Sequence, residues 1–386
     1  PAPRGHRAKG PGISGLSLFH ALEEAVRGQG VQVRCQTQVQ RLVLSAEGPV
    51  AGVEGRSIPP KPGWASLHGR LSKINAKATT YAPGVAKRIT AILERIMDSR
   101  AQPYRIRAHK AVILAAGGFI FDPDMVQEQA PAYLRCLPLG TPGDDGAGIR
   151  LGESAGGHMA RMDRVSAWRF YVPPDVLMQG VLVNRQGERI CNEDLYGATL
   201  GEQIVANGGD AFLVFDSKTY REAVRKLKSQ AATFQWLYML PMFLIGRKKA
   251  GSLEALADKI GVSARGLQAT MTAYDATAGQ GQPDPLGKVP ERFVPQDTPP
   301  FYAIDCSLDS ASGVPCSAMT LGGLVVDEET GQVLRADGSA IEGLYAAGRN
   351  AVGVCSNAYV SGLSIADCVF SGRRAGRHAA QLLSEE

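Results

Sequence analysis

The sequence predicts an α/β fold in which a domain of nucleotide-binding type is interrupted by an α+β cap domain. Strands that run into glycine turns and then helices occupy residues 110–152 and again 320–383. That order is typical of sheets that bind nucleotides at their strand ends. Residues 166–300 between them carry polar strands and a Pro-rich stretch instead. The 386 residues suffice for two or three domains, and a cleft between domains is where a ligand is expected.

Composition excludes several classes of protein. Hydrophobic residues make up 44% and charged residues 20%, which is typical of a globular chain. No apolar run approaches the roughly 20 residues of a membrane span, and no signal peptide is visible. The seven cysteines show no CxxC or zinc-finger spacing. Neither a disulfide scaffold nor a metal site is therefore expected, and the expected compartment is the cytosol.

The first elements are a helix and one or two strands. Residues 16–28 have apolar side chains at helical spacing, and residues 31–44 read as strands. Residues 10–15, GPGISG, form a literal GxGxxG motif. A dinucleotide fingerprint requires a buried strand before it and an acid about 20 residues later. Both are missing, so the motif is interpreted as a glycine loop before the helix.

Residues 56–107 are expected to be a basic, inserted segment with one amphipathic helix near residues 85–97. Between Arg56 and Lys110 there are 12 Lys and Arg but only two acids. Such a patch favours an anionic partner, and we expect peripheral contact with a membrane as one use of it. Packing on the neighbouring domain, or a solvated surface, is the alternative. A nucleic-acid partner is not expected, because no matching motif occurs.

Two glycine turns lie within residues 110–152, the first of the two regions that have the strand–glycine–helix order. AVILAAGGF (111–119) reads as a buried strand that ends in Ala115, Ala116, Gly117 and Gly118. Small residues there let a ligand approach the backbone. The glycine loop 139–152 then opens a helix, with Asp144 and Asp145 near its positive end. Helix capping is the alternative for these acids.

The C-terminal block has the richest pattern. A strand over residues 344–347 ends in Gly348, and a loop leads to Tyr359 and Ser361. A helix is expected from about Ser364 to Leu383. Its N-terminus offers free N–H groups to an electron-rich ring edge. Tyr359 and Ser361 would share one face of an extended segment.

These motifs resemble the flavoprotein family of fumarate reductases, succinate dehydrogenase flavoprotein subunits and 3-ketosteroid dehydrogenases, most closely the 3-oxo-5α-steroid 4-dehydrogenases. The resemblance covers most of the chain except the basic segment and residues 220–300. It implies a partial Rossmann-like FAD-binding domain. That family begins with a strand and a true GxGxxG, which are absent here, so an N-terminally truncated piece is expected. The matching pieces are TQVQRL (37–42), KAVILAAGGF (110–119), GTPGDDGAGI (140–149), VNRQGERICNED (183–194), TLGGLVVD (320–327) and GLYAAGR…YVSGLSIAD…GRRAG (343–376).

The resemblance also implies domain bounds and cofactor contacts. The FAD-binding domain takes residues 1–55, 108–165 and 306–386, the basic helical insert 56–107, and the substrate domain 166–305. Arg349 stands where many relatives have a Glu near the FAD ribose or diphosphate. The expected FAD-binding residues are Val39, Ala115, Ala116, Gly117, Gly118, Asp145, Gly348, Arg349, Gly362, Ser364 and Ile365.

Substrate chemistry follows from one position. Fumarate-type enzymes place an arginine before the C-terminal helix to grip a carboxylate, and the matching residue here is Tyr359. A small apolar ketone is therefore the expected substrate. By resemblance, Tyr359 and Ser361 are catalytic: the tyrosine removes the proton next to the ketone, and the neighbouring carbon delivers hydride to flavin N5. Tyr196 is the candidate second tyrosine, with Tyr171, Tyr220 and Tyr238 as alternatives. Asn192, Glu193 and Gly362 are the further expected substrate contacts.

Two alternatives stay open. One is a fumarate-reductase-like reductase of an unsaturated acid, which requires a cation in the loop that Tyr359 occupies. The other is an inactive fragment without flavin. The electron acceptor is not indicated by the sequence.

Overall fold

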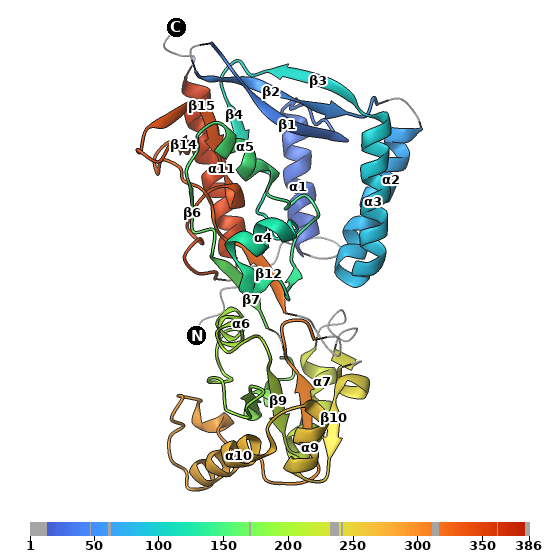
Figure 1. Ribbon diagram of the computed structural model, residues 1–386, viewed down its shortest axis with the longest axis vertical. Coiled ribbons are helices and arrows are strands. Elements are labelled where there is room, and N and C mark those ends of the chain that lie inside the picture. Colours follow the sequence, from blue (N-terminus) through green and yellow to red (C-terminus); the bar gives the residue numbers. More distant parts are fainter. Residues whose placement is uncertain are drawn as a thin grey trace. The chain divides into compact units, whose positions relative to one another are not determined.

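The computed structural model describes residues 14–46, 48–60, 63–169, 171–231, 239–240, 242–310, 316–360 and 362–382. Ser361, Tyr238 and most of the GPGISG motif lie outside the described residues. The chain divides into two compact units (Figure 1). Unit 1 comprises Pro1–Phe121, Thr141–Arg161 and Leu321–Glu386, and unit 2 comprises Asp122–Gly140 and Met162–Thr320.

Unit 1 contains the glycine-rich motifs of both ends of the chain. β4 pairs in parallel with β15, and β14 pairs antiparallel with β15 on its other side. Helix α11 packs on β15, burying Ala375 and Ala379 against Tyr345. The elements of unit 1 are α1 (Ser14–Gly28), β1 (Thr37–Leu44), β2 (Val50–Ser57), α2 (Trp64–Tyr81), α3 (Pro83–Arg100), β3 (Gln102–Arg107), β4 (Val112–Leu114), α5 (Ala147–Ser154), β6 (Met159–Ala160), β13 (Gly323–Leu324), β14 (Gln332–Leu334), β15 (Ala340–Ala346), η5 (Gly348–Asn350) and α11 (Leu363–Gln381).

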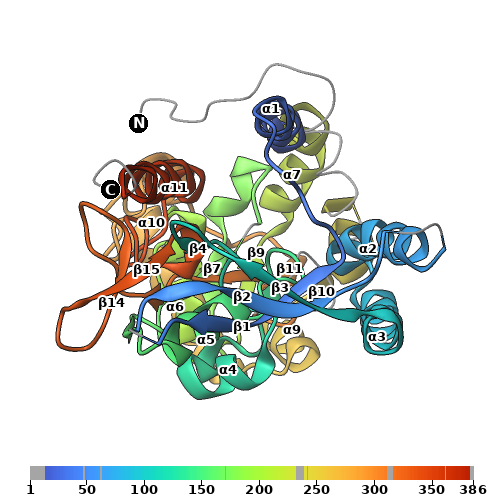
Figure 2. The same ribbon diagram turned by 90° about the horizontal axis from the view of Figure 1, so that it is seen from above.

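A second sheet of unit 1 is the antiparallel meander β1–β2–β3. Gly55 of β2 lies against β1 so closely that a Cβ there would be 2.0 Å from the carbonyl oxygen of Gln38. Helices α2 and α3 connect β2 to β3 as a hairpin. In Figures 1 and 2 this hairpin lies at one end of the meander, and α11 lies at the other.

Unit 2 is built on the four-stranded sheet β10–β11–β9–β8. Its core packs the apolar faces of α9 and α10 against that sheet, with Leu256, Leu267 and Met271 fully buried. The elements of unit 2 are α4 (Pro123–Gln129), η1 (Pro131–Tyr133), β5 (Leu137–Pro138), β7 (Val165–Trp168), η2 (Asp175–Gln179), β8 (Val181–Val183), α6 (Gly197–Ala206), β9 (Phe212–Phe215), α7 (Ser217–Gln230), η3 (Met242–Gly246), β10 (Lys248–Ala250), α9 (Leu253–Ile260), α10 (Ala264–Gly279), η4 (Pro290–Arg292), β11 (Phe301–Asp305) and β12 (Ser317–Thr320).

The division differs from the expected domain bounds at three places. Residues 122–140, 162–165 and 306–320 group with unit 2, whereas the sequence placed them in the FAD-binding domain. The reason is the sheet β5–β12–β7: Leu137 of β5 pairs in parallel with Ser317 of β12, and β12 pairs antiparallel with β7. The pairing partners of these short strands lie far away in sequence, so periodicity alone cannot assign them.

The secondary structure agrees with the expectation at two helices and differs in the basic segment. α1 and α11 begin and end within a few residues of the predicted bounds. The basic segment holds two helices where one was expected, and residues 31–36 form no strand. No helix among the described residues is both long and apolar enough to span a membrane. All seven cysteines are free.

Candidate functional site

The turn after β4 in unit 1 brings the backbone of Gly117 and Gly118 close to the carboxylate of Asp144. Gly117 has φ +92°, a conformation that favours glycine. A Cβ at this position would be 2.1 Å from Oδ1 of Asp144. The backbone N–H of Gly118 donates to the same oxygen at 3.1 Å. Ala115 and Ala116, on the approach to this turn, are exposed.

Asp144, and not Asp145, joins the two glycine motifs. The Asp144 side chain is 5% exposed and also accepts from the N–H of Thr141 at 3.0 Å. Arg349 donates to it through Nη2 at 2.6 Å. Asp145 instead accepts from the N–H of Ala147 at 3.0 Å in a local turn ahead of α5, whose N-cap is Gly146. The predicted contact of Asp145 with FAD stays a prediction.

The turn after β15 carries polar groups with unused hydrogen-bonding capacity. Gly348 has φ +59°, and its N–H donates to Oγ of Ser371 at 2.9 Å. Within the described part of the chain, Nη1 of Arg349 is buried without a hydrogen-bond partner. The same holds for both side-chain polar atoms of Asn350, which is 0% exposed. Gly148 at the start of α5 leaves room for Asn350, since a Cβ there would be 2.5 Å from Nδ2.

These residues fit the polar part of a dinucleotide. Buried donors and acceptors without partners are costly unless a ligand or water satisfies them. The glycines at positions 117 and 148 let the Asp144 and Asn350 side chains lie directly against the backbone, and α5 begins beside them. A guanidinium, backbone N–H groups and a helix N-terminus together bind phosphate and hydroxyl oxygens well.

Val39 faces a separate hollow of unit 1. It lines a cavity of about 630 Å³ between β1 and α5, together with Arg150, Leu151 and Ser154. Small-molecule sites have this size and mixture of apolar and polar lining. The predicted contact of Val39 with the cofactor stays a prediction.

The start of α11 positions Tyr359. Gly362 takes φ +88° at the N-cap, and Ser364 and Ile365 form the first turn. The hydroxyl of Tyr359 lies 3.4 Å from Oγ of Ser364, so the phenol is anchored to this turn. Gly362 and Ile365 also line a groove of about 990 Å³ along α11. The partner predicted for Tyr359 on its strand face, Ser361, is outside the described residues.

Asp367 of α11 fixes the loop that leads to Tyr359. Its carboxylate is 4% exposed and accepts from the N–H of Val354 at 3.3 Å. A Cβ on Gly353 would come within 2.4 Å of it, so the loop passes very close. Burial, and then the charge of Asp367, raises the pKa of the Cys355 thiol to about 11. Cys355 therefore stays a neutral thiol at physiological pH.

In unit 2, Glu193 belongs to a buried ionic network. The carboxylate, 0% exposed, lies 2.7 Å from Nη2 of Arg189 and 2.8 Å from Nζ of Lys288. It also accepts from the N–H of Leu182 at 2.9 Å. Arg189 in turn binds Asp284 at 2.5 Å. Burial lowers the pKa of Lys288, against the opposing charge of Glu193.

The network gives Glu193 a structural role in unit 2. Its oxygens are committed to protein partners, which leaves little capacity for a substrate. Asn192 is half-buried, and its Oδ1 accepts from the N–H of Asp194 at 2.8 Å in a local turn. Tyr196 is 41% exposed and stacks edge-on against Trp168, with ring centroids 4.8 Å apart. The substrate contacts predicted for Asn192 and Glu193, and the catalytic role predicted for Tyr196, stay predictions.

Gly117, Gly118, Asp144, Gly148, Arg349, Asn350 and Ser371 are together called the cradle. The fold of unit 1 and this cradle define a protein of the dinucleotide-binding α/β class. The FAD binding domain family model matches residues 2–364, so the chain belongs to that family, and its cofactor is FAD.

Three known proteins are similar to this chain over most of its length. A 3-oxo-5-alpha-steroid 4-dehydrogenase of Comamonas testosteroni is 35% identical over 356 residues, covering 90% of this chain and 66% of that protein. A probable fumarate reductase of Shewanella frigidimarina is 25% identical over 387 residues, covering 98% and 55%. The crystal structure of 3-ketosteroid-Δ4-(5α)-dehydrogenase from Rhodococcus jostii RHA1 with 4-androstene-3,17-dione matches at a TM-score of 0.74 and 28% identity, covering 98% and 68%. The chain thus spans about half to two thirds of these relatives.

Sequence reasoning missed three residues of the cradle. Asp144 was noted only as an acid near a helix end, and the adjacent Asp145 was chosen in its place. Asn350 and Ser371 carried no motif signal. Their importance comes from burial and from partners in other elements, which no local pattern reports.

Proposed function

We propose that the chain is an FAD-dependent oxidoreductase that introduces a C=C bond next to a ketone, with a 3-ketosteroid-like apolar ketone as substrate. The observation that carries the proposal is the position of Tyr359. A phenol anchored to the first turn of α11 stands where a carboxylate-binding reductase requires a cation. The relatives described as ketosteroid dehydrogenases support the same choice.

In the proposed mechanism, Tyr359 removes the proton from the carbon next to the ketone. The ketone acidifies this C–H, and the hydrogen bond to Ser364 orients the phenol oxygen. The free N–H groups at the start of α11 stabilise negative charge that develops nearby. FAD, when bound, supplies the two-electron oxidation of the neighbouring carbon.

A phenol is a weak base at neutral pH and needs a relay for its proton. We propose Ser361 and Tyr196 as members of that relay. The 41% exposure of Tyr196 supports a role in passing the proton to solvent. Asp144, Arg349 and Asn350 are proposed to hold the ribose and diphosphate part of FAD, and Val39, Gly117 and Gly118 to contact it through their backbone.

The test is anaerobic reduction of the flavin. The chain is saturated with FAD, mixed with a saturated 5α-3-ketosteroid, and the oxidised flavin band is followed. Bleaching supports the proposal, and Tyr359→Phe then slows it by about 10²–10⁴-fold with flavin binding unchanged. Tyr133→Phe, a half-buried tyrosine of unit 2, is the matched control.

Two other outcomes have distinct signatures. If the oxidised flavin band persists with the ketosteroid, and fumarate reoxidises the chemically reduced flavin, the protein is a fumarate-reductase-like reductase of an unsaturated acid. A chain that retains no flavin at all indicates the inactive fragment.

We also propose that the protein is cytosolic and that its basic segment, residues 56–107, contacts a membrane surface peripherally, where apolar ketones accumulate. The excess of Lys and Arg in this segment supports it.

A further inference from the structure

The exposed faces of α2 and α3 repeat one pattern of side chains. The exposed residues of α2 include Leu67, Arg70, Ile74 and Lys77, and those of α3 include Val85, Arg88, Ile92 and Arg95. Both sets alternate apolar and basic residues at steps of three, four and three. These steps place each set along a single helical stripe. The four apolar members are 42–54% exposed.

The opposite faces of the two helices are buried against each other. Asn75 and Thr90 hydrogen-bond across the pair at 2.9 Å, and Thr79 and Ala86 are buried beside them. Ile96 and Met97 of α3 pack on Ile58 at the base. The α2–α3 hairpin is therefore internally complete, and its apolar stripes are not needed for its own packing.

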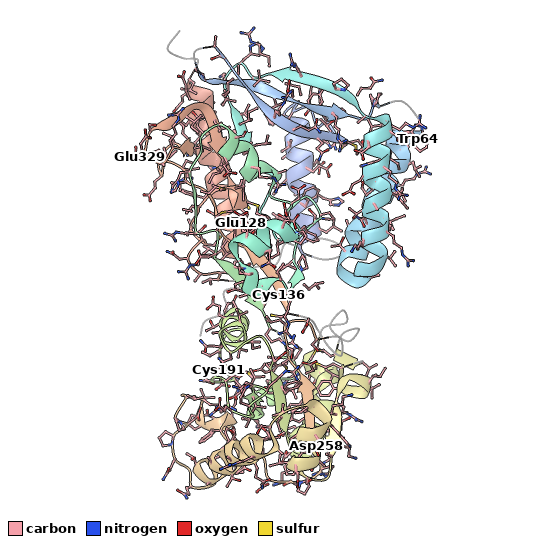
Figure 3. All side chains as sticks on the ribbon, in the orientation of Figure 1. Trp64, Glu128, Cys136, Cys191, Asp258 and Glu329 are labelled. Atoms are coloured by element: carbon pink, nitrogen blue, oxygen red, sulfur yellow. The ribbon has the colours of Figure 1, made fainter. Side chains whose placement is uncertain are left out.

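The charge of the hairpin is positive and largely unpaired. Residues 64–100 carry seven Lys and Arg against two acids. One acid, Asp98, pairs with Arg56 at 2.5 Å. Arg100 lies over the ring of Trp64 at 4.4 Å, at the sheet end of the hairpin (Figure 3). Among the described residues, no ion pair engages the four basic members of the two stripes.

A protein partner and a nucleic acid each fit this surface less well than a bilayer. Four apolar side chains separated by cations form no contiguous patch of the size that stable protein docking needs. Phosphate backbones would use the cations but leave Ile74 and Ile92 without a role. At an anionic bilayer both kinds of residue are used, because the apolar ones enter the acyl boundary and the cations meet the headgroups.

We propose that the two stripes of the α2–α3 hairpin form a docking surface for an anionic lipid bilayer. The inference rests on the proposed peripheral contact and names its residues and its lipid class. Ile74 and Ile92 supply the apolar contact, and the flanking cations supply selectivity for anionic headgroups. The hairpin lies at the end of the meander away from α11 in both views, so docking leaves α11 uncovered (Figures 1 and 2).

Co-sedimentation of the whole chain with vesicles tests the proposal without substrate or turnover. Vesicles of phosphatidylcholine and phosphatidylglycerol in equal parts are expected to bind at least tenfold more tightly than vesicles of phosphatidylcholine alone. Ile74→Asn with Ile92→Asn is expected to weaken binding about tenfold at unchanged charge. Arg70→Gln with Arg88→Gln is expected to remove the preference for anionic lipid.

Matched controls come from unit 2. Val224 and Leu286 are exposed to 47% and 46%, and Val224 lies on the basic helix α7. Val224→Asn with Leu286→Asn is expected to leave binding unchanged. Equal binding to both vesicle types, or wild-type binding by the Ile74/Ile92 variant, would overturn the proposal. So would displacement of the vesicles by an oligonucleotide. A thermal melt of each variant confirms that it is folded, and flavin reduction is scored separately, so failure of one proposal does not imply failure of the other.

Discussion

The guanidinium of Arg349 and the carboxylate of Asp144 join two glycine motifs 205 residues apart, with Nη2 2.6 Å from Oδ1. The pair uses one side of the guanidinium and leaves Nη1 buried and without a partner in the described chain. A charged donor held in this way is preorganised for an anionic oxygen.

Arg349→Met is expected to weaken FAD binding by roughly 10–100-fold, which corresponds to the loss of one or two charge-assisted hydrogen bonds. Fluorescence titration of the flavin measures the change. Arg335→Met, an arginine of unit 1 outside the cradle, is the control and should bind FAD as the wild type does. If both variants bind FAD with the same affinity, Arg349 does not contact the cofactor.

Ser364→Ala is expected to slow flavin reduction by a smaller factor than Tyr359→Phe, about tenfold, because it loosens the phenol without removing it. Stopped-flow absorbance measures the rate, with each variant saturated with FAD. A rate equal to that of the wild type would show that the Tyr359–Ser364 contact at 3.4 Å has no part in the reaction.

Glu193→Ala is expected to destabilise unit 2 by about 3–5 kcal/mol, because Arg189 and Lys288 lose the carboxylate between them while staying buried. Urea unfolding measures this. A substrate-binding role predicts the reverse, with stability preserved and KM raised. Glu188→Ala, five residues earlier, is the control, since its contact to Asn184 is partly exposed.

Acidification is expected to lower the free energy of unfolding of unit 2 through protonation of Asp284. Burial acts to raise the pKa of this carboxyl, but hydrogen bonds from Arg189 and from the N–H of Lys288 outweigh burial and hold the pKa below its usual range. The unfolded chain therefore takes up the proton first as the pH falls, and stability is lost on the way down through the folded pKa. Asp284→Asn should be less stable at pH 7 and should lose less on acidification. Urea midpoints between pH 7 and pH 3 measure both, and parallel profiles of the two proteins would exclude Asp284 as a source of the loss.

Two helical glycines are expected to respond with opposite signs. A Cβ at Gly266 of α10 would be 1.8 Å from the carbonyl oxygen of Gln186, a backbone clash that side-chain movement cannot relieve. Gly266→Ala should therefore cost more than about 2 kcal/mol. Gly372 of α11 meets nothing within 4 Å, so Gly372→Ala should stabilise by up to roughly 1 kcal/mol. Thermal melts compare the two, and a stabilised Gly266→Ala would contradict the close approach.

The sequence by itself determined the family, the cofactor and the helices with strong periodicity. The motifs at residues 110–119, 140–149 and 343–376 are local, and so are the turns that bound α1 and α11. Local signals of this kind depend on backbone conformation and on amphipathic spacing, which neighbouring residues fix.

Only the tertiary structure decided which of two adjacent acids meets Arg349, and that Glu193 lies buried between two cations. It also decided that residues 122–140 pack with unit 2 and that the basic segment is a pair of helices. Helix α2 has few apolar residues, so its periodicity is weak, and its exposed stripe has meaning only beside α3. The common reason is that burial and strand pairing bring together side chains that are far apart in the chain. In addition, a shift of one residue along a strand changes which side chain faces inward.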